Sequence, residues 1–281
     1  MDALRTVISY LGMEDHQTED NSPEANLEKS IRMMARIPTA LAAFHRSRRN
    51  MLPIDPNPKL SFAENFFNMC FGEVPEPEVV RCFDISLTLY AEHSFNASTF
   101  AARVITSTLS DIYGAVAGAI GALKGPLHGG ANEAVMHMLL EIESPEKAQD
   151  WIDDALANKK TVMGFGHRVY KSGDSRVPTM HQALLDMAKI KDGAKWVEIG
   201  DIVAETFIIQ KNIHPNLDYP AGPAYYLMGF DIDLFTPIFV VSRITGWTAH
   251  VMEQLADNRL IRPLSVYNGS KQREIIPMGD R

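Results

Sequence analysis

Two histidines and one aspartate lie in short polar motifs within a chain whose pattern is otherwise apolar and helical. His128 belongs to the motif GPLHGGANE, His167 to VMGFGHRVYK and Asp218 to PNLDY. A carboxylate can remove a proton from carbon while imidazoles hydrogen-bond the oxygen atoms on which negative charge develops. These three side chains therefore favour proton transfer coupled to the formation of a carbon–carbon bond.

His128 lies in a glycine-flanked turn, with Gly125 before it and Gly129 and Gly130 after it. Glycines allow backbone angles that other residues avoid, and they let a ligand approach the chain closely. Asn132 then begins a predicted helix, whose first amide groups favour an anion nearby. Taken alone, the motif is equally consistent with a corner between two helices in which the histidine is incidental.

His167 lies in the segment GFGHR, which contains the first two glycines of a dinucleotide-binding Gly-x-Gly-x-x-Gly motif. Val169 occupies the position of the third glycine and no strand pattern precedes the segment, so this interpretation fails. The remaining prediction is a loop that presents His167 among cationic side chains, which are Lys160, Arg168, Lys171 and Arg176. Such a loop suits phosphate or carboxylate, although a solvated run of charge is the more common explanation for a lone loop of this kind.

Asp218 and Arg243 are charged residues in apolar surroundings. Burial raises the proton affinity of a carboxylate, which suits Asp218 to a role as general base. A plain helix cap ahead of Pro220 is the alternative for Asp218. Arg243 is the only formal charge in the range 234–252. Because a buried guanidinium needs a partner and no acid lies one turn away, Arg243 pairs either with a distant acid or with a bound anion such as a substrate carboxylate.

Helices must position these groups, because apolar residues recur with the 3.6-residue period over most of the chain and strand signals are scarce. The predicted helices span Asp2–Leu11, Pro23–Arg49, Ser61–Phe71, Pro75–Glu92, Ala97–Ser107, Ile112–Leu123, Ala131–Glu141, Pro145–Leu156, Pro178–Ala188, Lys195–Lys211, Pro220–Met228 and Leu234–Asp257. The sequence thus predicts an all-α fold. The ranges 97–103 and 114–121 are rich in small residues, which fits close packing within the chain or a dimer interface.

Composition excludes several classes of function. The chain has 281 residues, of which 46% are hydrophobic and 22% charged, as in a globular protein. A net charge of −8 without a basic stripe argues against general nucleic-acid binding. The apolar range 234–252 contains Pro237 and Arg243, so it predicts a buried helix and no membrane span. With only Cys70 and Cys82 and no signal peptide, we expect free thiols in a reducing cytoplasm, and no histidine–cysteine cluster indicates a metal site.

The three motifs together resemble the citrate synthase family, and the resemblance extends over essentially the whole chain. GPLHGGANE, GFGHRVY and NLD occur in the order of that family. The resemblance implies that Asp218 removes a proton next to the thioester of an acyl-CoA and that His128 stabilises the resulting enol or enolate. It implies that His167 polarises and protonates the ketone of oxaloacetate, after which water hydrolyses the acyl-CoA intermediate.

The resemblance also implies substrate contacts. It places His93, Arg176, Arg243 and Arg262 at oxaloacetate, with Arg262 reaching in from the other subunit of a homodimer. It assigns coenzyme A to the backbone of a loop whose members are Thr161, Val162, Met163, Gly164 and Phe165, with Lys171 as a weaker candidate for phosphate. The acyl-CoA is a co-substrate, and no permanently bound cofactor is expected.

By the same resemblance, a large helical domain comprises residues 1–128 and 235–281, and a small domain, residues 129–234, closes over the substrates. The segments NLDYPAGPAYY and FTPIF are closest to bacterial 2-methylcitrate synthases, which prefer propanoyl-CoA. One methylene gives only about 1–3 kcal/mol of discrimination, which leaves acetyl-CoA open. The family normally has a further N-terminal portion, and this sequence begins within what resembles a family helix. We therefore expect an active acyltransferase or, as the alternative, an inactive helical dimer with a binding or structural role.

Overall fold

The computed structural model describes residues 1–125, 128–166, 170 and 173–281. Over these residues the chain forms helices and no strands, apart from one isolated bridge between Phe165 and Pro215. The prediction of an all-α fold is confirmed. In chain order the helices are α1 (Asp2–Glu14), α2 (Pro23–Arg48), α3 (Phe62–Phe71), α4 (Pro77–Tyr90), α5 (Ala97–Thr106), α6 (Ile112–Leu123), α7 (Ala131–Ile142), α8 (Pro145–Ala157), α9 (Val177–Ala188), α10 (Ala194–Lys211), α11 (Asp218–Leu227), the 3-10 turn η1 (Ile232–Leu234), α12 (Phe235–Ala256) and η2 (Met278–Asp280).

The start of α11 differs from its prediction in a way that bears on function. The sequence predicts a start at Pro220, whereas the helix begins at Asp218 with Leu217 as its N-cap residue. A proline fits within the first turn because the N–H groups there have no partner inside the helix. The helix-cap interpretation of Asp218 is therefore wrong, which leaves its carboxylate available for another role.

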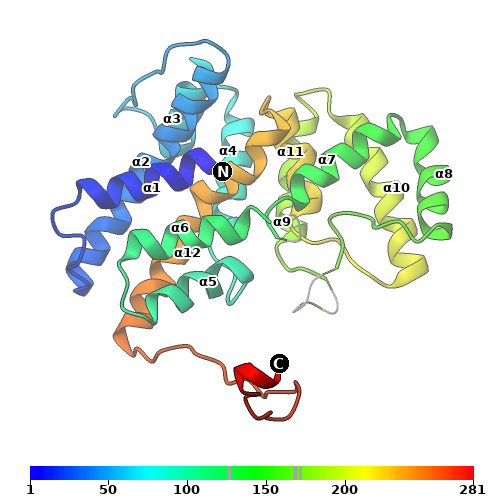
Figure 1. The fold of residues 1–281 in the computed structure, drawn as a ribbon. Helices are drawn as coiled ribbons and strands as arrows, with labels where there is room; N and C mark the ends of the chain where they lie inside the picture. Colours follow the sequence, from blue (N-terminus) through cyan, green and yellow to red (C-terminus); the bar gives the residue numbers. More distant parts are fainter. Residues whose placement is uncertain (126–127, 167–169, 171–172) are drawn as a thin grey trace.

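Figure 1 shows two groups of helices, with α1–α6 and α12 in one group and α7–α11 in the other. The long helix α12 packs against α2, α4, α5 and α6 and is buried over most of its length. In the smaller group, α11 packs against α7 and α9, and α10 packs against α8. The two groups meet where α4 contacts α9 and where α12 contacts α7. The predicted domain boundaries at residues 128 and 234 stay predictions.

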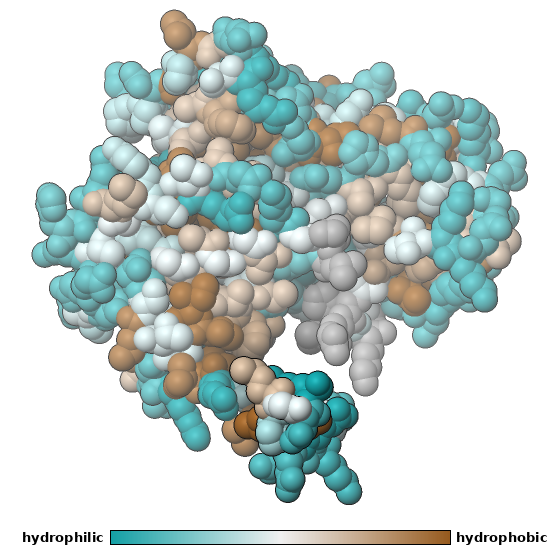
Figure 2. All heavy atoms as spheres, viewed as in Figure 1, coloured by the Kyte–Doolittle hydropathy of each residue, from teal (hydrophilic) through white to brown (hydrophobic). Residues whose placement is uncertain are grey.

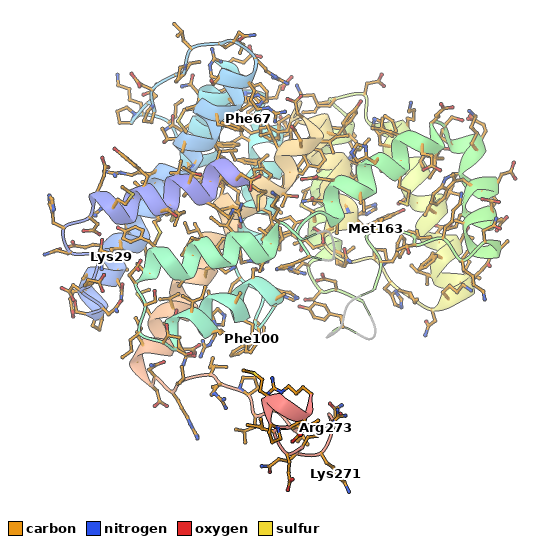
Figure 3. All side chains as sticks on the ribbon, viewed as in Figure 1. Lys29, Phe67, Phe100, Met163, Lys271 and Arg273 are labelled. Carbon is orange, nitrogen blue, oxygen red and sulfur yellow. The ribbon has the colours of Figure 1, made fainter. Side chains whose placement is uncertain are left out.

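Aromatic side chains form much of the core around α3 and α4. Phe66 and Phe67 on α3 contact Phe83 on α4 and Phe230, with ring centroids 5.2–5.8 Å apart. Figure 3 labels Phe67 at this point of α3. Such aromatic pairs contribute about 0.5–1.5 kcal/mol each beyond the burial of their area. They fix α4, which carries Tyr90 at its end.

Glycines allow close approach between helices at two places. A Cβ atom at Gly246 of α12 would lie 2.4 Å from the carbonyl oxygen of Ala91, to which the Gly246 N–H donates at 3.0 Å. A Cβ atom at Gly118 of α6 would lie 2.2 Å from Cδ1 of Ile105 on α5. At least part of the small-residue pattern therefore serves packing within the chain, and a dimer interface on these helices stays a prediction.

The apolar range 234–252 lies almost entirely within the buried helix α12, as predicted. No helix in the described part of the chain has the length and apolar character needed to cross a membrane. Cys70 and Cys82 are free and buried, and burial raises the pKa of each thiol to about 12. Both thiols are therefore protonated and unreactive at neutral pH.

Candidate active site

A cavity of about 320 Å³ lies where the two groups of helices meet, and five of the residues predicted to be catalytic or to bind oxaloacetate line it. These residues are His93, His128, Arg176, Asp218 and Arg243. They come from the segment after α4, the turn before α7, the start of α9, the start of α11 and the middle of α12. A larger cavity of about 710 Å³ between α4 and α9 has none of them in its wall. The fold thus brings together titratable groups that are far apart in the sequence.

The other predicted site residues differ in where they lie. His167 and Lys171 fall outside the described residues, so their roles stay predictions. Arg262 is exposed in the extended segment after α12 and does not line the cavity. Phe165, the last residue of the predicted coenzyme A loop, does line it.

Ser98 at the start of α5 holds the imidazole of His128. The Ser98 N–H donates to Nε2 at 3.2 Å, and the Ser98 Oγ lies 2.8 Å from the same nitrogen. Because a backbone N–H can only donate, Nε2 is an acceptor and the single proton of the neutral ring belongs on Nδ1. Burial lowers the pKa of His128 to about 4, and the charge of Arg243 adds to this effect. At neutral pH His128 is therefore a neutral hydrogen-bond donor through Nδ1.

Asp218 is surrounded by protein, with part of its surface open to the cavity. Burial raises the pKa of Asp218 above its ordinary value, while a hydrogen bond from Tyr90 and the charges of Arg176 and Arg243 oppose this rise. The Tyr90 hydroxyl donates to Oδ1 of Asp218 at 2.6 Å. A carboxylate with raised proton affinity, held in one orientation, is suited to remove a proton from carbon.

The segment that precedes Asp218 is paired with the predicted coenzyme A loop. Asn216 N–H donates to the carbonyl oxygen of Gly164 at 2.8 Å, and Gly166 N–H donates to that of His214 at 2.9 Å. Gly164 has φ +80°, and a Cβ atom there would lie 2.6 Å from a methyl carbon of Val135. Only glycine fits this position, because it needs both a left-handed backbone and close contact. The loop and the candidate base are therefore fixed to each other.

Asp174 orients Arg176 within the cavity. Its two carboxylate oxygens accept from Nε of Arg176 at 2.9 Å and from Nη2 at 2.7 Å. Oδ2 of Asp174 also accepts from the N–H of Leu217 at 3.2 Å, which connects this ion pair to the residue before Asp218. Burial alone would raise the pKa of Asp174, but the hydrogen bonds and charge of Arg176 outweigh it and hold the pKa below the ordinary value.

This ion pair predicts a dependence of stability on pH. Because the pKa of Asp174 is lowered in the folded state from the ordinary 3.8, its contribution to stability is present above pH 3.8 and is lost as the pH falls through the folded pKa. Asp174→Asn leaves the largely buried Arg176, whose side chain is 15% exposed, without its charge partner, so we expect the free energy of unfolding at pH 7 to fall by about 2–3 kcal/mol and to depend less on acid. Urea denaturation at pH 7 and at acidic pH measures both effects. The exposed Asp186, which pairs with Lys189, provides the control Asp186→Asn, and an equal loss in both variants would contradict the prediction.

Arg243 is 2% exposed, and its Nε donates to the carbonyl oxygen of Tyr90 at 2.5 Å. Its guanidinium lies over the ring of Phe239 at 4.6 Å from the centroid. Within the described ranges no carboxylate forms an ion pair with it, so the interpretation of Arg243 as part of a structural ion pair has no support there. Burial lowers the pKa of Arg243 to about 10, with a further effect from Arg176, which still leaves the group charged at neutral pH. A charged guanidinium beside a cavity is suited to bind a carboxylate.

Sequence reasoning missed Tyr90, Ser98 and Asp174, which hold the predicted groups in place. Asp174 stands two residues before Arg176 in the sequence, so a local signal for this pair was present. Ser98 and Tyr90 lie 30 and 128 residues from their partners, and no periodic pattern indicates such contacts. His93, the predicted oxaloacetate contact that lines the cavity, stacks its ring on the ring of Tyr170, with the two centroids 5.6 Å apart.

The helical architecture and the site define a protein class. A family model described as the C-terminal domain of citrate synthase matches residues 1–264, and the chain belongs to the citrate synthase family. The chain is 61% identical over 276 residues to a citrate synthase from Mycolicibacterium smegmatis, a match that covers 98% of this chain and 74% of that relative. It is 60% identical over 273 residues to a 2-methylcitrate synthase from Mycobacterium tuberculosis, which covers 97% of this chain and 69% of that relative.

Solved structures agree with this assignment. The fold matches a citrate synthase from Thermoplasma acidophilum, solved as a ternary complex with carboxymethyl coenzyme A and oxaloacetate, with a TM-score of 0.91 and 34% identity. That match covers 99% of this chain and 75% of the solved chain.

Proposed function

We propose that this chain condenses an acyl-CoA with oxaloacetate and water to give 2-methylcitrate or citrate and free coenzyme A. The observation that carries the proposal is the convergence of His128, Asp218, Arg176 and Arg243 on one cavity. Relatives at 60% and 61% identity bear the names of the two enzymes concerned. The alternative of an inactive helical dimer gains no support from the described residues, since these four groups are all in place.

In the proposed reaction, Asp218 takes a proton from the carbon next to the thioester. The electron pair moves onto the thioester oxygen, where the Nδ1–H of neutral His128 stabilises the developing charge. The enolate carbon then attacks the ketone carbon of oxaloacetate, whose carboxylates bind Arg176 and Arg243, with His93 as a further contact. His167 is the proposed donor of a proton to the ketone oxygen, and water finally cleaves the thioester. Closure of the proposed small domain, residues 129–234, excludes bulk water before proton removal.

Product analysis tests the proposal. Mass spectrometry of reactions with oxaloacetate and either acyl-CoA should find 2-methylcitrate from propanoyl-CoA and citrate from acetyl-CoA. If the products were free propanoate or acetate, with no new carbon–carbon bond formed, the proposed condensation would be contradicted. We propose propanoyl-CoA as the preferred donor, and a single methylene limits that preference to about 10–200-fold.

We also propose that the chain acts as a homodimer in which Arg262 reaches the site of the partner subunit. Arg262 lies in the exposed segment that follows α12. In Figure 1 this segment extends away from the two groups of helices. Figure 2 shows apolar side chains gathered on the surface around α5, near this segment, and Phe95, Phe100 and Leu109 are exposed there. Figure 3 labels Phe100 on α5. An exposed apolar surface of this kind is typical of a protein interface.

A mixed dimer tests the role of Arg262. Chains carrying His128→Ala and Arg262→Ala are co-expressed with different affinity tags, and the heterodimer is purified through both tags. Since each site would take His128 from one chain and Arg262 from the other, one of the two sites is intact, and we expect about half of the wild-type rate. Both homodimeric variants should be nearly inactive. A heterodimer as inactive as the homodimers would contradict the sharing of sites.

A further inference from the structure

Tyr90 contacts both the candidate base and a candidate substrate-binding arginine. It is the last residue of α4 and is 2% exposed. Its hydroxyl donates to Oδ1 of Asp218, and its carbonyl oxygen accepts from Nε of Arg243. Its ring packs against Phe239, with centroids 4.4 Å apart, which fixes the direction of the hydroxyl.

Among the described residues, charged or titratable groups from α4, the segment before α9, α11 and α12 surround Asp218. The set comprises Tyr90 of α4, Asp174 and Arg176 before α9, Tyr225 of α11 and Arg243 of α12, and His128 lines the same cavity. Arg176 is already bound to Asp174, and Arg243 donates to the Tyr90 carbonyl oxygen. In the part of the chain that the structure describes, Tyr90 alone hydrogen-bonds the Asp218 side chain, and it does so at Oδ1 only.

We propose that the Tyr90 hydroxyl is a positioning group for the reaction: it binds Oδ1 of Asp218, keeps the carboxylate ionised and leaves Oδ2 to take the proton. This role rests on the proposed function. Desolvation of Asp218 favours its neutral form, which cannot act as a base, and a donor aimed at one oxygen favours the ionised form. Burial raises the pKa of Tyr90 well above its ordinary value, so the hydroxyl stays protonated and able to donate.

Tyr90→Phe removes the donor and keeps the ring against Phe239. A hydrogen bond to a charged group is strong enough that its loss should raise the pKa of Asp218 by roughly 1–2 pH units. The acid limb of the kcat/KM profile for the acyl-CoA should therefore move to higher pH by the same amount. We expect kcat on the plateau to fall about tenfold because the carboxylate loses its fixed orientation. The KM for oxaloacetate should not change, since the backbone carbonyl that holds Arg243 is retained.

Tyr225→Phe is the matched control. Tyr225 is also fully buried, and its hydroxyl donates to Oγ of Ser86 at 3.2 Å rather than to Asp218. Both variants thus lose one buried tyrosine hydroxyl and should lose similar stability. A merely structural role for Tyr90 would give the two variants the same pH profile.

A second readout does not depend on turnover. Carbon-13 NMR of the protein labelled at the aspartate carboxyl carbons, with Asp218→Asn to assign the signal, follows the titration of Asp218 directly. A rise in this pKa in Tyr90→Phe and none in Tyr225→Phe is expected. Equal titration in both variants overturns the proposal, whatever the turnover. If the pKa moves but no form of the chain makes product, the contact is confirmed while the proposed function and the reaction role of Tyr90 both fail.

Discussion

Replacing Asp218 with asparagine is expected to lower oxaloacetate-dependent thiol release by about 10²–10⁴-fold, the range that a general base contributes. The amide cannot accept the proton from the substrate carbon. Its oxygen still accepts the hydrogen bond from Tyr90, so the start of α11 should keep its structure. Oxaloacetate should therefore still bind, because Arg176 and Arg243 are unchanged.

Stopped-time thiol assays and calorimetry with oxaloacetate measure the two properties separately. Asp201→Asn is a matched control, since the half-exposed carboxylate of Asp201 contacts His181 and lies outside the cavity. It should retain wild-type turnover. An Asp218→Asn chain with unchanged turnover would show that another group removes the proton.

Replacing His128 with alanine is expected to lower kcat by about 10²–10³-fold, the loss that follows removal of one donor to a developing oxyanion. The variant leaves the negative oxygen of the enolate without the Nδ1–H donor that Ser98 orients. Because burial lowers the pKa of His128 to about 4, the ring is a neutral donor at neutral pH. The wild-type profile should show no limb from His128 over roughly pH 5–8, where a histidine ordinarily titrates.

His137→Ala is a suitable control for this variant, because His137 is exposed on α7 and does not line the cavity. Steady-state rates from pH 5 to 9 would be compared for the three proteins. If His128→Ala keeps wild-type kcat, the enolate oxygen must find its donor elsewhere.

The helices were predictable because their apolar residues repeat with the helical period, and proline or glycine marks many of their ends. Pro145 and Pro23, for example, occupy first turns. The start of α11 was not predictable, because Asp218 precedes Pro220 and either residue fits a first turn.

The candidate site was predictable in its residue types and only partly in its geometry. The sequence showed that Arg243 needs a partner, and the two solutions were an acid and a bound anion. Only the fold could distinguish an acid from a bound anion as the partner of Arg243, because it shows which side chains surround the guanidinium. For the same reason the contacts of His128 with Ser98 and of Asp218 with Tyr90 came from tertiary structure. The role of Arg262 needs a second chain and stays a prediction.

The most direct test of the proposed function is thiol release by the purified 281-residue chain from propanoyl-CoA and from acetyl-CoA, each with and without oxaloacetate. We predict release that requires oxaloacetate with both donors, with the larger kcat/KM for propanoyl-CoA. Release at the same rate without oxaloacetate, or no release from a folded chain that binds oxaloacetate, would contradict the assignment of His128 and Asp218 to this condensation.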